Sequence, residues 1–202
     1  MSEDPREKHA RPPHPSQQQA PPGLESEMAP KPDSGEGSFK GSGKLRGKLD
    51  VEIVGVDLVK MFHRLDPALS RLRVVEASLS TWLPDRPFNL ITCVHGLHYV
   101  GHKLSLVSRA AYWLVEGGQF VANLDLHNLK FADGKPAGRR VAADLRRSGL
   151  EYDRRRRRII CRGRMIVNLP YVYMGADDRA GPNDTGQPAV DSYYEGVVGP
   201  SR

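Results

Sequence analysis

The sequence predicts an α/β fold: a mostly parallel sheet with helices on both faces and an antiparallel hairpin at its C-terminal end. Two observations predict it. Short β-branched runs alternate with segments whose apolar residues recur at helical spacing, and strands that alternate with helices pair in parallel through right-handed crossovers. The last two strand-like runs are separated only by Arg162 and Gly163, as the strands of a hairpin are.

The 202 residues suffice for one ordinary domain, and the composition indicates that not all of them belong to it. The chain has 16 prolines, half of which precede Asp33, and five glycines fall between positions 35 and 47. Such a stretch does not bury enough apolar surface to offset the entropy of ordering it. We therefore predict a disordered or weakly ordered Pro/Gly-rich arm over 1–45, the α/β domain over 46–175, and a loop and tail over 176–202.

The predicted elements of the domain follow one another from Val51. Gly117 and Gly118 are predicted to end the second helix, because glycine commonly terminates helices. The expected elements are strands at 51–57, 74–77, 88–94 and 119–126, helices at 58–72, 104–115 and 139–148, and hairpin strands at 152–161 and 164–173.

The positive charge of the chain is confined to one stretch. The net charge is +6, but residues 136–164 hold eleven arginines against three acids, so the remainder is slightly acidic. The run from Arg154 to Arg158 falls within a predicted strand, where alternate side chains point to opposite faces. We interpret the run as a charged edge strand that resists aggregation rather than as a nucleic-acid surface, since no interleaved aromatic residues offer base stacking.

Several classes of protein are not expected. No apolar run approaches the roughly 20 residues that a membrane span needs, and the polar N-terminus lacks the apolar core of a secretory signal. Cys93 and Cys161 stand alone, so neither a disulfide scaffold nor a thiolate zinc site is expected. We expect a cytoplasmic protein without a membrane partner.

Asp57 closes the first strand of the domain. An acid at the carboxyl end of an early strand of an α/β sheet lies at the ligand crevice, where it can bind both hydroxyls of a ribose. An aspartate between a strand and a helix is also a common helix N-cap, and this second interpretation stays open.

Five segments in order carry a family resemblance: Val-Gly-Val-Asp-Leu at 54–58, Val-Val-Glu-Ala-Ser-Leu at 74–79, Phe-Asn-Leu-Ile-Thr-Cys-Val-His-Gly-Leu-His-Tyr-Val at 88–100, a helix, and Glu-Gly-Gly-Gln-Phe-Val-Ala at 116–122. Over about 51–173 the chain resembles the class I S-adenosylmethionine-dependent methyltransferases, whose fold is Rossmann-like. The resemblance implies S-adenosylmethionine as cofactor. It also implies cofactor-binding roles for Gly35, Gly37, Asp57, Leu58, Ser78 and Leu79, and positions near the transferring methyl group for His95, His98 and Tyr99.

The first motif of that family departs from the pattern. Asp33-Ser34-Gly35-Glu36-Gly37 can be laid on the family's glycine-rich turn, but the residues before it include Pro30 and Pro32, which a central strand does not accept. A catalytically inactive methyltransferase-like interaction module is therefore an alternative to the enzyme. An RNA methyltransferase that uses the arginines is a further alternative.

Three histidines at positions 95, 98 and 102 have a spacing that could serve a metal ion. No carboxylate or cysteine completes a ligand set, so no metal is expected. We instead expect His95, His98 and Tyr99 to line the mouth for a small-molecule methyl acceptor, with one imidazole able to take up a proton. Neither the identity of the acceptor nor the oligomeric state follows from the sequence.

Overall fold

The computed structural model describes residues 13, 15–18, 27–31, 51–58, 69–181 and 189–197. The chain divides into two compact units, Met1–Val51 and Glu52–Arg202. The predicted arm and the predicted helix at 58–72 lie largely outside the described residues, as do Gly35 and Gly37. All elements described below belong to the second unit.

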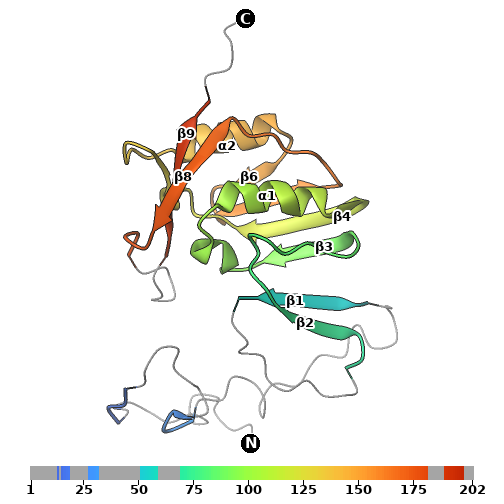
Figure 1. The fold of residues 1–202 in the computed structure, drawn as a ribbon, viewed down its shortest axis with the longest axis vertical. Coiled ribbons are helices and arrows are strands. Elements are labelled where there is room, and N and C mark those ends of the chain that lie inside the picture. The colour runs from blue at the N-terminus through green and yellow to red at the C-terminus, as the bar shows by residue number, and fades with distance from the viewer. Residues whose placement is uncertain are drawn as a thin grey trace, which may run out of the picture. The chain divides into compact units, whose positions relative to one another are not determined.

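The largest sheet has four strands in the order β3-β4-β7-β6 (Figure 1). β3 (Phe88–Cys93) runs parallel to β4 (Leu114–Asn123), while β7 (Arg158–Arg162) runs antiparallel both to β4 and to β6 (Glu151–Asp153). Because β7 starts opposite the end of β4, the turn between β6 and β7 lies at the edge where β3 and β4 end.

A second, parallel sheet consists of β1 (Ile53–Asp57) and β2 (Leu72–Glu76). The amide of Ala77 donates to the carbonyl of Asp57 at 2.8 Å, which holds the chain together just beyond the two strand ends. Among the described residues, neither strand is hydrogen-bonded to β3. Two ion pairs connect this sheet to the loop that precedes β3: Arg73–Asp85 and Arg86–Glu52.

The third sheet contains the C-terminal strands, in the order β5-β9-β8. β5 (Leu129–Phe131) pairs in parallel with β9 (Asp191–Gly196), and β8 (Tyr171–Asp177) pairs antiparallel to β9. The prediction of a loop and tail over 176–202 is therefore wrong for β9. The ring of Tyr194 explains the strand, because it is fully buried in the core of the domain.

Two α-helices pack on these sheets. α1 (Lys103–Tyr112) contacts β4, and α2 (Gly138–Arg147) contacts β5 and β6. The predicted apolar face of α1 is confirmed, since Val107 and Ala111 are fully buried. In α2, Val141 is fully buried as well. No helix in the described ranges is both long and apolar enough to traverse a lipid bilayer.

The helix predicted at 104–115 ends three residues earlier than expected, and the role assigned to Gly117 and Gly118 is wrong. Both glycines lie inside β4, in a bulge: Leu114 pairs with Phe88, whereas the next pair is Gln119 with Leu90. A Cβ on Gly118 would lie 2.8 Å from the carbonyl oxygen of Phe88. The glycine is thus needed for close approach of two strands and not for a helix stop.

The predicted C-terminal hairpin is also misplaced. An antiparallel pair does follow α2, but it consists of β6 and β7, and the arginine run forms the turn between them. The α/β class is confirmed, but the described strands form three separate sheets, and the two larger ones contain both parallel and antiparallel pairs.

Candidate functional site

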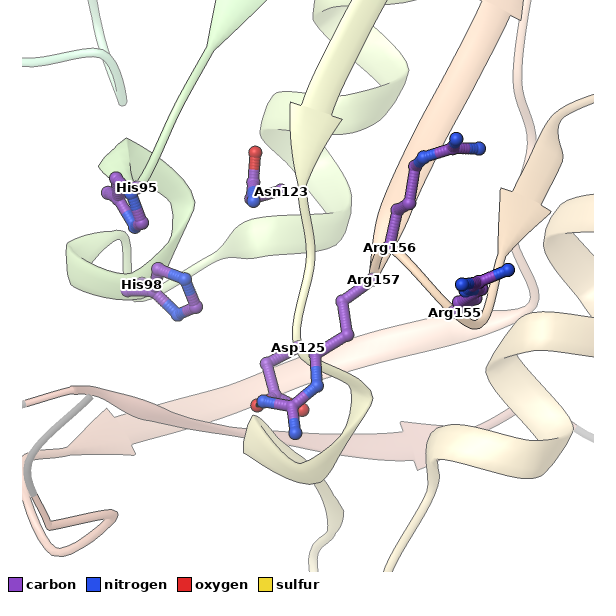
Figure 2. A pocket seen from close by; sticks show the side chains of 7 residues that line it. All are labelled: His95, His98, Asn123, Asp125, Arg155, Arg156 and Arg157. Carbon is purple, nitrogen blue, oxygen red and sulfur yellow. The ribbon is translucent and has the colours of Figure 1, made fainter. Parts of the chain in front are cut away.

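A pocket of about 190 Å³ lies at the carboxyl edge of the four-stranded sheet (Figure 2). Its walls come from the turn after β3, the end of β4, and the turn between β6 and β7. Ligands of α/β sheets bind at this edge, because strand ends and the loops that follow them converge there. The lining residues are His95, His98, Asn123, Asp125, Arg155, Arg156 and Arg157.

Two lining residues have a strained backbone. His95 and Arg157 adopt positive φ angles of 62° and 48°, and they are the two non-glycine residues to do so in the described part of the chain. A left-handed conformation costs a non-glycine residue on the order of 1–3 kcal/mol, and such strain clusters at functional sites. The backbone therefore marks this pocket independently of its charges.

The histidine wall of the pocket belongs to a short 3-10 helix, η3 (Gly96–Tyr99). The rings of His95 and His98 lie 6.0 Å apart between centroids and are nearly parallel. Leu97, between them, is 1% exposed and anchors the turn in the core. The amide of Val190, just before β9, donates to the carbonyl of His98 at 2.9 Å. This wall is thus held by a part of the chain about 90 residues away.

A buried lysine strengthens the same connection. The Lys103 ammonium, 1% exposed, donates to the carbonyl oxygens of Val100 at 2.9 Å and Val190 at 2.6 Å, and to the Ser192 hydroxyl at 2.9 Å. Burial lowers the pKa of Lys103 to about 8, although the charge of Asp191 acts in the opposite direction. The start of α1 and the start of β9 are therefore fixed to each other beside η3.

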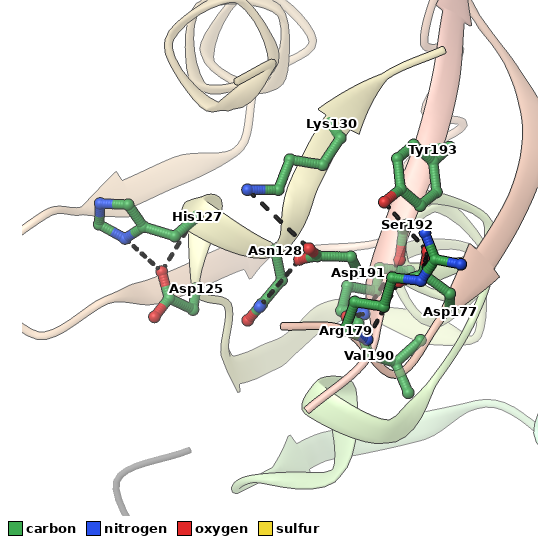
Figure 3. Close-up of polar contacts among 11 residues, drawn as sticks. Asp125, His127, Asn128, Lys130, Asp177, Arg179, Val190, Asp191, Ser192 and Tyr193 are labelled. Carbon is green, nitrogen blue, oxygen red and sulfur yellow. Dashed lines mark hydrogen bonds and ion pairs between the residues drawn. The ribbon is translucent and has the colours of Figure 1, made fainter. Parts of the chain in front are cut away.

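His98 is the lining residue best suited to accept a proton. Burial lowers the pKa of its imidazole, against a raising effect of the Asp125 carboxylate, so the ring is neutral at pH 7. The side chain of Asn128 also hydrogen-bonds His98, and its amide donates to Asp191 at 3.2 Å (Figure 3). That donation leaves the amide oxygen of Asn128 to accept the ring N–H, so the other ring nitrogen keeps its lone pair.

Asp125 forms the floor of the pocket at the end of β4. Its carboxylate accepts the amide and the ring Nδ1 of His127 at 2.9 and 2.8 Å, and Arg157 donates to it at 2.9 Å. Burial would raise the pKa of Asp125, but the His127 hydrogen bonds and the Arg157 charge outweigh it, and the pKa is lowered. The carboxylate is thus ionised and already engaged.

The arginine run supplies the third wall, which corrects its interpretation as an edge strand. Arg155, Arg156 and Arg157 lie in the tight turn between β6 and β7 and all reach the pocket. Arg156 donates to Asp153 at 3.2 Å. The guanidinium of Arg155 has no ion-pair partner within the residues that the structure describes. The side chains diverge from this turn: Arg157 reaches Asp125, whereas Arg156 is directed to Asp153 (Figure 2).

The predicted cofactor residues lie elsewhere. Asp57 is exposed at the carboxyl end of β1, Leu58 beyond it is 68% exposed, and Ser78 and Leu79 follow the end of β2. The Ala77–Asp57 hydrogen bond brings these two strand ends together, but none of these residues lines the pocket. The structure thus places His95 and His98 in one pocket, whereas Asp57 and Ser78 lie at the adjacent ends of β1 and β2.

The loop that carries Ser78 and Leu79 is held in place by Arg109 of α1. The Arg109 guanidinium donates to the carbonyl oxygens of Leu79 and Ser80, both at 2.7 Å, and to that of Trp82. Leu79 and Trp82 pack against the core. The position of this loop is therefore fixed relative to α1.

Neither Tyr99 nor His102 lines the pocket. Tyr99, at the end of η3, is 42% exposed. The ring of His102 stacks on Tyr173 at 4.3 Å, and its Nδ1 accepts the amide of Ser105 at 3.3 Å. In the described ranges, no set of three or more His, Cys, Asp or Glu side chains is arranged to hold a metal ion.

Sequence reasoning missed Asn123, Asp125 and the three arginines as members of the site. For Asp125 a signal was present, since it lies near the end of the strand predicted at 119–126, much as Asp57 closes the strand predicted at 51–57. The arginines could be assigned to the site only if a turn was expected at 154–157, and the sequence instead predicted a continuous strand over 152–161.

Comparison with known proteins assigns no family. No family model and no solved structure matches the chain. A curated protein of Bacillus subtilis (strain 168), "Uncharacterized oxidoreductase YhxD", is 62% identical over 34 residues, which is 17% of this chain. The chain spans only 11% of the length of that relative.

Proposed function

We propose that this protein is an S-adenosylmethionine-dependent methyltransferase that acts on a small-molecule acceptor. The observation that carries the proposal is the succession of strand pairs: β1 with β2 in parallel, β3 with β4 in parallel, then an antiparallel β7 beside β4. Parallel strand pairs followed by an antiparallel hairpin are what the sequence predicts for this domain, although the hairpin, β6 and β7, lies earlier in the chain than expected. The proposal takes the two parallel pairs as portions of one Rossmann-like sheet.

The residues at the ends of β1 and β2 fit the nucleoside part of the cofactor. Asp57 offers a carboxylate for two ribose hydroxyls, and the neighbouring strand end offers the Ser78 hydroxyl and the apolar side chain of Leu79. Gly35 and Gly37, which the resemblance assigns to the same ligand, lie outside the described residues. When bound, S-adenosylmethionine supplies an electrophilic methyl group on a sulfonium.

The pocket provides the remaining requirements of methyl transfer. A neutral His98 with one free ring nitrogen can take the proton that an acceptor hydroxyl or amine loses. The buried contacts of η3 hold the imidazole in one orientation, which a transfer in line with the leaving sulfur demands. Positioning and a single base are therefore the contributions expected of this chain.

Calorimetric titration of the full chain with S-adenosylhomocysteine tests the proposal. Charged hydrogen bonds contribute about 1.5–3 kcal/mol each, so Asp57→Ala should weaken binding by roughly tenfold or more. Glu52→Ala removes the same charge just before the opposite end of β1 and is the matched control, with unchanged affinity expected. Both residues are exposed, and an exposed ion pair such as that of Glu52 with Arg86 contributes at most about 1 kcal/mol, so folding should change little in either variant.

Two outcomes would count against the proposal. Equal binding by wild type and Asp57→Ala removes Asp57 from the cofactor site. An absence of heat at millimolar ligand favours the inactive interaction module instead.

An oxidoreductase is a second candidate, supported by the partial match to the B. subtilis protein. An acid at a strand end binds the ribose of a nicotinamide dinucleotide as well as that of S-adenosylmethionine. NADH titrated in parallel distinguishes the two candidates, because only one of the ligands should saturate the protein at micromolar to low millimolar concentration.

A further inference from the structure

We propose that the pocket between η3 and the β6–β7 turn binds the anionic head group, phosphate or carboxylate, of the methyl acceptor. Identifying the ligand as the acceptor rests on the proposed function, whereas the anion site itself rests on the geometry of the pocket alone.

The charges of the lining residues favour an anion. Three arginines face a single carboxylate, that of Asp125, and Arg157 already compensates it. His98 adds no charge of its own at pH 7, because burial lowers the pKa of its imidazole. The surplus of positive charge therefore comes from Arg155, while Arg156 shares its charge with Asp153 just outside the lining.

The donors are suited to an oxyanion. Guanidinium groups present paired N–H donors that match the oxygens of carboxylate and phosphate. The guanidinium of Arg155 has no ion-pair partner among the described residues, and that of Arg156 makes one contact to Asp153 at 3.2 Å. Asn123 adds a neutral polar side chain at the end of β4 (Figure 2).

The strained turn explains how the arginines reach the site. The positive φ of Arg157 reverses the chain just before β7, and the Asp153 carboxylate accepts the amide of Arg156 at 3.0 Å. These contacts fix the turn over the carboxyl edge of the sheet. A run of arginines on a regular strand would have split between two faces.

The volume and the layout limit the kind of ligand. About 190 Å³ is less than the roughly 300 Å³ at which pockets for drug-sized ligands begin. The histidines lie on one wall and the arginines come from the opposite turn (Figure 2). The guanidinium groups of Arg155 and Arg156 point away from the histidines, so an anionic head that they hold lies on the side of the pocket farther from His98, the proposed proton acceptor (Figure 2).

The test uses the full chain without any S-adenosyl ligand. Inorganic phosphate and malonate are titrated separately at low ionic strength, and the ring signals of His95 and His98 are followed by long-range ¹H–¹⁵N NMR. We expect saturable shifts of both rings and a higher pKa of His98 in the presence of the anion. The anion that binds more tightly identifies the head group as phosphate or carboxylate.

The chain offers a matched control. Arg155→Gln/Arg156→Gln removes two charges that line the pocket, whereas Arg154→Gln/Arg158→Gln removes two adjacent charges that do not. The first pair should weaken anion binding at least tenfold, and the second less than about twofold. Thermal unfolding of both double variants shows whether each is folded.

Three results would overturn the anion site. The first two are an absence of shifts in the ring signals of His95 and His98, and equal weakening of anion binding by the two double variants. The third is a short single-stranded RNA that binds more tightly than phosphate and loses affinity equally in the two double variants. If S-adenosylhomocysteine binds while neither anion does, this inference fails and the methyltransferase proposal stands. If an anion binds through Arg155 and Arg156 while S-adenosylhomocysteine does not, the site stands and the methyltransferase proposal fails.

Discussion

Replacing Lys103 by Met should change the pH dependence of stability in a direction that the burial of the ammonium dictates. The pKa of Lys103 is lowered from 10.5 to about 8 in the folded chain. Below pH 8 both the folded and the unfolded states bind the proton. Between pH 8 and 10.5 the unfolded state retains it and the folded state loses it, so the free energy of unfolding rises with pH.

The size of this effect follows from the same two values. A change of one pKa unit corresponds to 1.36 kcal/mol, so Lys103 should add about 2 kcal/mol of stability between pH 7.5 and pH 10. Lys103→Met should lack this increment. Raised tyrosine pKa values, such as that of Tyr194 at about 12, lower stability at high pH, but they act in both proteins and cancel in the difference.

The assay is urea unfolding at pH 7.5 and pH 10, followed by the fluorescence of Trp82 and Trp113, for wild type and Lys103→Met. The free energy of unfolding of the wild type, relative to that of Lys103→Met, should rise by about 2 kcal/mol from pH 7.5 to pH 10. A difference that stays constant with pH would refute the reasoning, because it would mean that the ammonium is not buried against β9.

Two other substitutions test the packing around the site. Gly118→Ala should destabilise the domain by about 1–3 kcal/mol, since its Cβ would lie 2.8 Å from the backbone oxygen of Phe88. Gly117→Ala, whose Cβ would meet nothing within 4 Å, is the control and should not destabilise it; equal effects in thermal unfolding would contradict the bulge. Tyr152→Phe removes a buried hydrogen bond of 2.9 Å to the carbonyl of Leu124 and should cost about 1–2 kcal/mol in urea unfolding. No measurable loss would indicate that water reaches this carbonyl next to the pocket floor.

The sequence predicted the elements whose side-chain pattern is local. β1, β2 and β3 lie within two residues of the expected strands, and α2 within one residue of its expected bounds. These elements have period-2 or period-3.6 patterns bounded by polar residues, so nearby residues alone define them.

The errors arose where distant contacts decide the structure. Gly117 and Gly118 are typical of a helix end, yet the approach of β3 requires Gly118 within a strand. β9 is a strand because Tyr194 and Ser192 enter a core formed by earlier elements, which a Gly/Pro-rich tail does not indicate. Tertiary packing overrode local propensity in both places.

For the candidate site, the sequence identified one wall and missed the others. The resemblance predicted His95, His98 and Tyr99 as one group, and His95 and His98 line the pocket whereas Tyr99 does not. Arg155 and Arg156 were misassigned because strand-forming residues flank the run on both sides. The residues that reverse the chain, Asp153 and Arg157, do so through a side-chain contact and a left-handed backbone, and neither has a distinctive composition.

Because the Val190 amide donates to the carbonyl of His98, its hydrogen exchange reports how often the histidine wall of the pocket opens. Its exchange with deuterium requires that the segment before β9 detach from η3, and the same opening frees the imidazole wall. How often the wall loosens in solution can therefore be read at a position far along the chain, without any ligand and without altering a residue that faces the cavity.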